Sequence, residues 1–325
     1  MILYSEKWTD YRLLDCSSGE RLEQWGSHVL IRPDPQVIWQ TPKEHPGWQA
    51  AQARYERSPS GGGRWERLAP SNISGAAGAT GAAGAHAPEL PGAPEVAADP
   101  PRAPETLAAL PAKWKISYGR LTFNVSLMNF KHTGLFPEQA VNWDCIGEAI
   151  SSAGRKISLL NLFAYTGAAT LAATAAGAEV CHVDAARGMV ARARENAAAS
   201  RLEDKPVRWI VDDCAKFVER EIKRGRRYDA LIMDPPSYGR GPSGEVWKLE
   251  DDIYGFLKLC AGVLSDDPLF VMINSYTTGL SPSSLAYIAT SLLGGDTCCY
   301  ELGLPVEASG SILPCGATCI WKARE

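Results

Sequence analysis

Three kinds of signal are missing from this 325-residue sequence, and each absence removes a class of protein. No apolar run approaches the roughly 18–20 residues of a membrane-spanning helix, so no membrane partner is expected. The opening MILYSEKWTDYR has no basic stretch followed by an apolar one, so no secretory signal is expected. The nine cysteines are an odd number without an export signal, which favours reduced thiols in the cytoplasm or in an organelle interior. No CxxC pair occurs among them, so no metal site is expected.

An excess of positive charge is also missing. The net charge of −4 argues against a protein that holds nucleic acid by electrostatics alone. The basic residues are nevertheless clustered: the stretch 113–131 has four of them and no acid, and KRGRR occupies 223–227. Each cluster is either a contact for nucleic acid or ordinary solvated surface.

The composition divides the chain into four parts. Residues 1–57 are rich in Trp, Tyr, Leu and Ile and are broken by turn pairs and prolines, which predicts the first part of a small β domain. Residues 58–111 consist mainly of Gly, Ala, Pro and Ser, which predicts a disordered, flexible insertion. Residues 112–135 are expected to complete the β domain, and 136–325 to form a second domain.

Strands and helices alternate along the chain from residue 155 onward. Five continuous apolar runs are separated by amphipathic stretches, a pattern typical of a parallel sheet covered on both faces. Two further runs close the chain. The pattern therefore predicts an α/β fold with a doubly wound, Rossmann-like sheet of seven strands, in which ligands bind at the carboxyl ends of the strands.

Acidic residues stand where three successive strands of this sheet are expected to end. Asp184, Asp213 and Asp234 follow the second, third and fourth strands, and Gly167 forms the turn after the first. A single acid of this kind is more often a helix cap. Asp184 follows Gly167 at the separation expected of an acid that binds a nucleotide ribose, and Asp213 is suited to an adenine amino group. No G-x-G-x-x-G occurs, which disfavours a nicotinamide-dependent oxidoreductase.

Five motifs carry a resemblance to a known family: KHTGLFPEQ, NLFAYTGAATLAA, VD at 183–184, DDCAKF and DPPSYGRG. In this order they resemble class I S-adenosylmethionine-dependent methyltransferases. More specifically, they resemble the bacterial 23S ribosomal RNA enzymes that modify cytosine C5 or guanine N7. The resemblance covers residues 114–325 and extends weakly over the small β domain.

The resemblance implies a set of residues that bind S-adenosylmethionine. Asp184 would hold the ribose, Asp213 the adenine amino group, and Phe136 would cover the cofactor. The methionine end would be contacted by Phe163, Tyr165, Thr166 and Gly167. Asp234 belongs to this set as well as to the catalytic one.

The expected catalytic residues are Asp234, Pro235, Tyr238 and Asn274. Asp234 and the Pro235 carbonyl are stiffly held acceptors that could grip an amino group, and Tyr238 could stack on a flipped base. The cytosine-C5 enzymes use a cysteine just after the fifth strand, where this chain has Asn274-Ser275-Tyr276. A hydroxyl is a much weaker nucleophile than a thiolate, so a nitrogen target is favoured, with Asn274 positioning the base.

The sequence therefore predicts an enzyme that transfers a methyl group from S-adenosylmethionine to a base of RNA, with ribosomal RNA as the expected partner. Methylation of a protein or a small molecule stays open as an alternative, and so does a non-catalytic scaffold that binds RNA. Acids at all three strand ends argue against the scaffold. The oligomeric state is not predicted.

Overall fold

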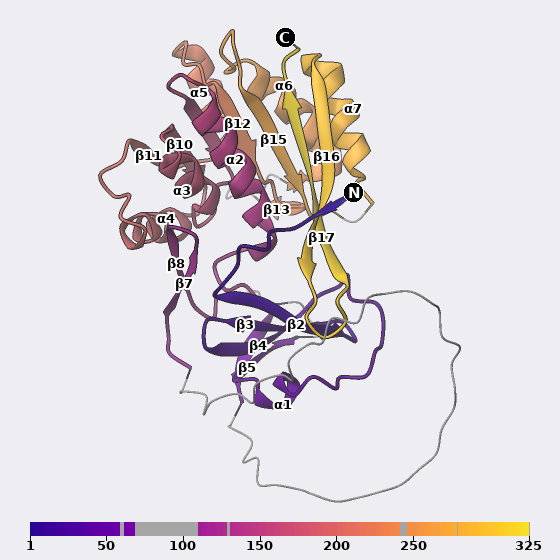
Figure 1. Cartoon of the computed structure of the whole chain (residues 1–325). Helices are drawn as coiled ribbons and strands as arrows, with labels where there is room; N and C mark the ends of the chain where they lie inside the picture. Colours follow the sequence, from indigo (N-terminus) through magenta and orange to yellow (C-terminus); the bar gives the residue numbers. More distant parts are fainter. Residues whose placement is uncertain (59–61, 69–109, 129–130, 241–245, 278, 325) are drawn as a thin grey trace, which may run out of the picture.

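The computed structural model contains a large sheet flanked by helices and a smaller β domain below it (Figure 1). It describes residues 1–58, 62–68, 110–128, 131–240, 246–277 and 279–324. In these ranges, no helix has the length and apolar character required to cross a membrane.

The large sheet has eight strands in the order β1-β16-β17-β15-β12-β9-β10-β11. Its strands are β1 (Ile2–Leu3), β9 (Ser158–Leu162), β10 (Glu179–Asp184), β11 (Val207–Val211), β12 (Ala230–Met233), β15 (Phe270–Ser275), β16 (Asp296–Pro305) and β17 (Ile312–Lys322). All neighbouring strands are parallel except β17, which is antiparallel to β15 and to β16. The predicted five parallel strands and closing pair are confirmed.

Helices cover both faces of this sheet. The helices are α2 (Ala140–Ser152), α3 (Ala168–Ala175), α4 (Arg187–Ala199), α5 (Cys214–Lys223), α6 (Leu249–Ala261) and α7 (Pro282–Leu293). Side chains alternate along each strand, so Leu159 packs toward α2 and α3, whereas Leu160 packs toward α5, α6 and α7. Both faces are apolar, which explains why the strands read as continuous hydrophobic runs.

One edge of the sheet corrects the sequence analysis. The two residues of β1, Ile2 and Leu3, pair in parallel with β16 and add an eighth strand to the seven that were predicted. The sequence analysis assigned them to the small β domain. A two-residue strand has too short a pattern to be recognised without its partner.

The small β domain contains a five-stranded sheet in the order β2-β3-β4-β5-β6. Its elements are β2 (Tyr11–Ser17), β3 (Glu20–Trp25), β4 (His28–Pro33), α1 (Gly47–Ala50), β5 (Ala53–Arg57) and β6 (Gly63–Arg67). The turn at Ser18-Gly19 joins β2 to β3. Trp25 and Leu30 are fully buried in its core.

Strand β6 lies inside the range 58–111 that the composition assigned to the insertion. Trp65 of β6 packs against Tyr55 with ring centroids 5.5 Å apart, and its indole N–H donates to the Met128 carbonyl at 2.7 Å. These contacts make residues 63–67 part of the β domain. Most of the expected insertion, 69–109, lies outside the described residues.

Two hairpins connect the small domain to the large one. The long β16–β17 hairpin runs from the large sheet down to the small domain, where Val306 bridges to Leu13 (Figure 1). Strands β7 (Trp114–Tyr118) and β8 (Leu121–Val125) form a separate hairpin outside the five-stranded sheet. It is anchored to α4, because the Asn196 Oδ1 accepts the Asn124 N–H at 2.8 Å.

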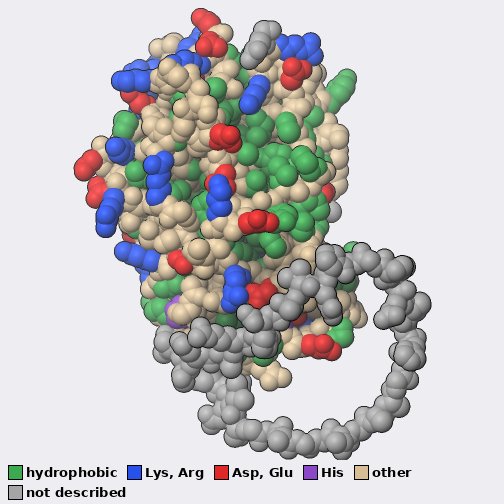
Figure 2. Space-filling model, in the orientation of Figure 1, with side chains coloured by type: hydrophobic (Ala, Val, Ile, Leu, Met, Phe, Trp, Pro, Cys, Tyr) green, Lys and Arg blue, Asp and Glu red, His purple; other side chains and the backbone are tan. Residues whose placement is uncertain are grey.

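A groove of about 590 Å³ lies beside α2, where β15, β17 and β16 form its floor. Figure 2 shows hydrophobic side chains gathered on this face of the molecule. None of the residues that line the groove is an expected site residue, and Tyr300 of β16 is in its wall.

Candidate active site

A cavity of about 890 Å³ opens at the carboxyl ends of β9, β10, β11 and β12. Sites for small molecules generally measure about 300–1,000 Å³, so this cavity has room for a nucleoside-sized ligand. Its walls contain seven residues expected from the sequence: Phe136, Phe163, Tyr165, Asp184, Asp213, Asp234 and Pro235.

A second, smaller cavity of about 50 Å³ adjoins the first and shares Phe136, Phe163, Tyr165 and Asp234 with it. Thr166, Gly167 and Asn274 line this smaller space, next to the first residues of α3. Of the expected site residues, Tyr238 alone lines neither cavity. It is 52% exposed in β13 (Tyr238–Arg240), where its neighbours Ser237 and Gly239 face the larger cavity instead.

The loop from β9 to α3 has an unusual backbone. Phe163 and Tyr165 have φ angles of 54° and 49°, a left-handed conformation that costs free energy for residues other than glycine. Gly167 follows with a φ of 88°, and a Cβ at this position would lie 2.9 Å from the Cβ of Ala193 in α4. The sequence analysis expected Gly167 to form the turn after the first strand of the sheet. The structure shows that the glycine is required by the positive φ and by contact with α4.

Asp184, at the end of β10, is held by this loop. Its two carboxylate oxygens accept the backbone N–H groups of Tyr165 and Ala186, each at 2.8 Å. Burial raises the pKa of Asp184, while these two N–H donors act to lower it. Each oxygen keeps a further acceptor position, so the carboxylate can accept hydroxyl groups of a ligand.

Asp213 has a structural role that the sequence analysis weighed as an alternative. It is the N-cap of α5, and its Oδ1 accepts the Lys216 N–H at 2.9 Å. Because Asp213 also lines the larger cavity, its free carboxylate oxygen can still face a ligand. Its position at the end of β11 serves both roles.

Asp234 stands between the two cavities, at the end of β12. Burial, with a smaller contribution from the Glu138 carboxylate, raises the pKa of Asp234 to about 7. The following prolines keep the corner rigid, because proline fixes φ and removes an N–H. The indole N–H of Trp247, in β14 (Val246–Lys248), donates to the Pro236 carbonyl at 2.7 Å and holds the second proline in place.

Aromatic walls complete the larger cavity, and sequence reasoning gave several of them no role. Trp247 and Phe256 pack around Phe163 with ring centroids 5.4–5.6 Å apart. On the opposite side Phe136 packs against Tyr276, with centroids 5.7 Å apart. The strand-end pattern does not identify Trp247 or Phe256. They belong to β14 and α6 and do not follow a strand of the large sheet.

No thiol in the larger cavity is set up as a nucleophile. Cys214 is the one cysteine in its described wall, and burial raises its pKa to about 12. The Cys214 sulfur also accepts the Phe163 N–H at 3.4 Å. Because the thiolate is the reactive form, this side chain is inert near neutral pH.

Comparison with known proteins gives a consistent result. The family model described as S-adenosylmethionine-dependent methyltransferase matches residues 96–279. The ribosomal RNA large subunit methyltransferase K/L of Shewanella sp. (strain MR-4) is 29% identical over 156 residues, which are 47% of this chain and 21% of that protein. The protein of the same name from Syntrophotalea carbinolica is 27% identical over 166 residues. This chain thus spans about a fifth of the length of these relatives.

A solved structure matches the whole chain. It is the SAM-dependent methyltransferase from Agrobacterium tumefaciens, with 32% sequence identity, a TM-score of 0.82, and coverage of 100% of this chain and 94% of that one. The family model covers more than half of the chain, over the same strands that build the cavity. The chain therefore belongs to the S-adenosylmethionine-dependent methyltransferase family.

Proposed function

We propose that this protein transfers a methyl group from S-adenosylmethionine to a nitrogen of an RNA base. The observation that carries the proposal is the Asp234-Pro235-Pro236 corner, in which the Asp234 carboxylate borders both cavities and the two prolines stand in the wall of the larger one. Methyl transfer is an in-line displacement, so the main task of the site is to hold the acceptor atom at about 3 Å from the methyl group.

The side chains that line the two cavities fit S-adenosylmethionine. Asp184 offers acceptor oxygens for the ribose hydroxyls, and Asp213 offers one for the adenine amino group. The apolar side chains of Phe163 and Trp247 supply flat surfaces for a purine. The N-terminus of α3, next to the smaller cavity, suits a carboxylate such as that of the methionine end. When bound, the cofactor supplies an electrophilic methyl group on a sulfonium.

Asp234 has the properties required to orient and deprotonate a nitrogen. As a carboxylate it accepts an N–H from the base, which directs the nitrogen lone pair away from the acid. After transfer, one of its Oδ atoms can take the proton that the nitrogen must lose. A pKa of about 7 is close to the optimum for a general base at neutral pH.

Cytosine C5 is disfavoured as a target because that chemistry requires a thiolate to add to the base. Asn274 and Ser275 are the last two residues of β15, and they stand where the resemblance implies such a cysteine. Asn274 is itself buried, and its Oδ1 accepts hydrogen bonds from Asn142 and Thr318. These contacts fix Asn274 as part of the wall of the smaller cavity.

RNA as the acceptor is supported by the relatives, which are named as ribosomal RNA methyltransferases. A protein or small-molecule acceptor is the second candidate, and one observation favours it. Three of the four basic residues of 113–131 are engaged within the chain: Lys113 pairs with Glu195, Arg120 donates to the Ala175 carbonyl, and Lys131 donates to the Pro33 carbonyl.

The test supplies the protein with methyl-labelled S-adenosylmethionine and separate fractions of unmodified ribosomal RNA, protein extract and small metabolites. We expect label in RNA, and nucleoside mass spectrometry should place the new methyl group on a nitrogen. Asp234→Ala should abolish transfer while the affinity for S-adenosylhomocysteine stays within about tenfold, or about 1.4 kcal/mol. Label in the protein or metabolite fraction alone would overturn the choice of RNA.

A further inference from the structure

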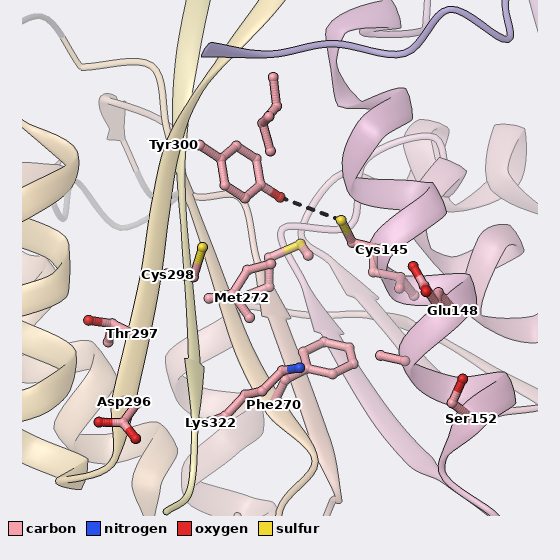
Figure 3. A pocket seen from close by; sticks show the side chains of 14 residues that line it. Cys145, Glu148, Ser152, Phe270, Met272, Asp296, Thr297, Cys298, Tyr300 and Lys322 are labelled. Atoms are coloured by element: carbon pink, nitrogen blue, oxygen red, sulfur yellow. Dashed lines mark hydrogen bonds between the residues drawn. The ribbon is translucent and has the colours of Figure 1, made fainter. Parts of the chain in front are cut away.

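A chain of buried hydrogen bonds runs from the groove beside α2 to the larger cavity. Tyr300, in the wall of the groove, donates to the Asn142 Oδ1 at 2.6 Å. The Asn142 Nδ2 donates to the Gln139 Oε1 at 2.7 Å, and the Gln139 Nε2 donates to the Tyr276 hydroxyl oxygen at 2.8 Å. Tyr276 is in the wall of the larger cavity. Figure 3 shows Tyr300 at the groove end, directed from β16 toward Cys145 of α2.

The chain has a direction because each link fixes the next. Tyr300 has one hydroxyl proton, and donating it to Asn142 turns the amide NH₂ of Asn142 toward Gln139. Gln139 then accepts a hydrogen bond with its Oε1 and donates one with its Nε2. Thr318 and Asn274 support the middle of the chain, since the Asn142 Nδ2 lies 2.9 Å and 3.0 Å from their side-chain oxygens. The Tyr276 oxygen therefore accepts, and its own proton remains to be donated.

The ring of Tyr276 has little freedom to turn away. A Cβ on Gly316 of β17 would lie 2.9 Å from both Cδ1 and Cε1 of Tyr276, so the glycine makes room for the ring. Phe136 packs on it with centroids 5.7 Å apart. With the oxygen tied to Gln139 and the ring held between β17 and Phe136, the remaining hydroxyl proton is left for the cavity that Asp234 also lines.

We propose that Tyr276 donates a hydrogen bond to the methyl-accepting base, beside the bond that Asp234 accepts from it. The inference rests on the proposed function and adds a recognition rule to it. The pair requires a base edge that presents an N–H next to a carbonyl or an unprotonated ring nitrogen. Burial raises the pKa of Tyr276 well above its ordinary value, so the hydroxyl keeps its proton and remains a donor.

The first experiment compares Tyr276→Phe with wild type, using single-turnover methyl transfer and binding of S-adenosylhomocysteine. Loss of the donor leaves an acceptor of the base without its hydrogen-bond partner in the cavity, and we expect transfer to fall by about tenfold or more. The affinity for S-adenosylhomocysteine should stay within about twofold. Tyr287→Phe is the matched control, because Tyr287 is 78% exposed on α7, and it should behave as wild type. A Tyr276→Phe protein with wild-type transfer would refute the proposal.

A second set of variants tests the chain itself. Tyr300→Phe should slow transfer by about threefold and add nothing to the loss in Tyr276→Phe, because its effect passes through Tyr276. Independent, multiplicative losses would show that the chain does not orient Tyr276. If Tyr276→Phe does not fold, Gly316→Ala displaces the ring while keeping the hydroxyl, and it should slow transfer in the same way. A Gly316→Ala protein that transfers at the wild-type rate would contradict the proposal.

The outcome for Tyr276 is separable from the outcome for RNA. All variants are measured with whichever fraction the wild-type protein labels. If label appears in protein or metabolites, the proposed acceptor is wrong, and Tyr276→Phe still reports on the donor. Equal activity of the variant on that acceptor would overturn the inference.

Discussion

The pH dependence of methyl transfer follows directly from Asp234. Its pKa of about 7 lies far above the ordinary value of 3.8 because the carboxyl group is buried at the corner of β12. If the carboxylate must accept an N–H, only the ionised fraction of the protein is active. That fraction is about 10% at pH 6 and about 90% at pH 8 for a pKa of about 7. The single-turnover rate should therefore rise about tenfold between these two values and then level off.

The assay is single-turnover transfer at saturating cofactor, with the affinity for S-adenosylhomocysteine measured at each pH as a control for binding. His132, in the wall of the same cavity, should not contribute to the pH dependence between pH 6 and pH 8. Burial lowers the pKa of His132 to about 4, so its ring stays neutral over this range. Glu138 is the charge that adds to burial at Asp234. Glu138→Gln should therefore lower the pKa of Asp234 and move the midpoint of the profile to lower pH.

Two results would refute this reasoning. A rate that is flat between pH 6 and pH 8 would mean that the ionisation of Asp234 does not limit transfer. A midpoint that does not move toward lower pH in Glu138→Gln would mean that a different group titrates. Residual transfer by Asp234→Asn, measured over long reaction times, should show no rise over the same range.

Three further predictions concern stability and cofactor binding. Asp234→Asn should stabilise the protein by about 2 kcal/mol at pH 8 and not at pH 3.5, measured by denaturant unfolding. The pKa of Asp234 is higher in the folded protein than in the unfolded one, so the wild-type protein loses stability as the pH rises above about 4. Partial hydration of the folded carboxylate makes this loss smaller than the full pKa shift would give. Gly167→Ala should lower stability by about 1–3 kcal/mol, seen as a lower Tm, because its φ is 88° and its Cβ would meet Ala193. Asp184→Ala should weaken S-adenosylhomocysteine binding at least about tenfold in calorimetry, since it removes the ribose acceptor and frees the Tyr165 N–H.

The fold and much of the site could be predicted because they depend on local patterns. Continuous apolar strands imply a sheet buried on both faces, and the carboxyl ends of parallel strands lie at one edge. Asp184 and Asp234 line the same cavity for that reason. Asp213 shows the limit of the argument. A helix cap and a ligand-binding acid occupy the same sequence position, and the N-cap bond to Lys216 became visible only in the structure.

What the sequence by itself determined is the order of strands and helices, and with it the acids gathered at one edge. Tertiary structure decided the features that depend on long-range contacts. Tyr238 lies outside the cavity and Trp247 lines it. Successive residues of the β13–β14 pair point to opposite faces, and the face with Gly239 and Trp247 is the one toward the cavity. The pKa of Asp234 depends on burial, which no single segment sets. Tyr276 accepts a hydrogen bond from Gln139, 137 positions away, and such a contact arises only when distant segments pack together.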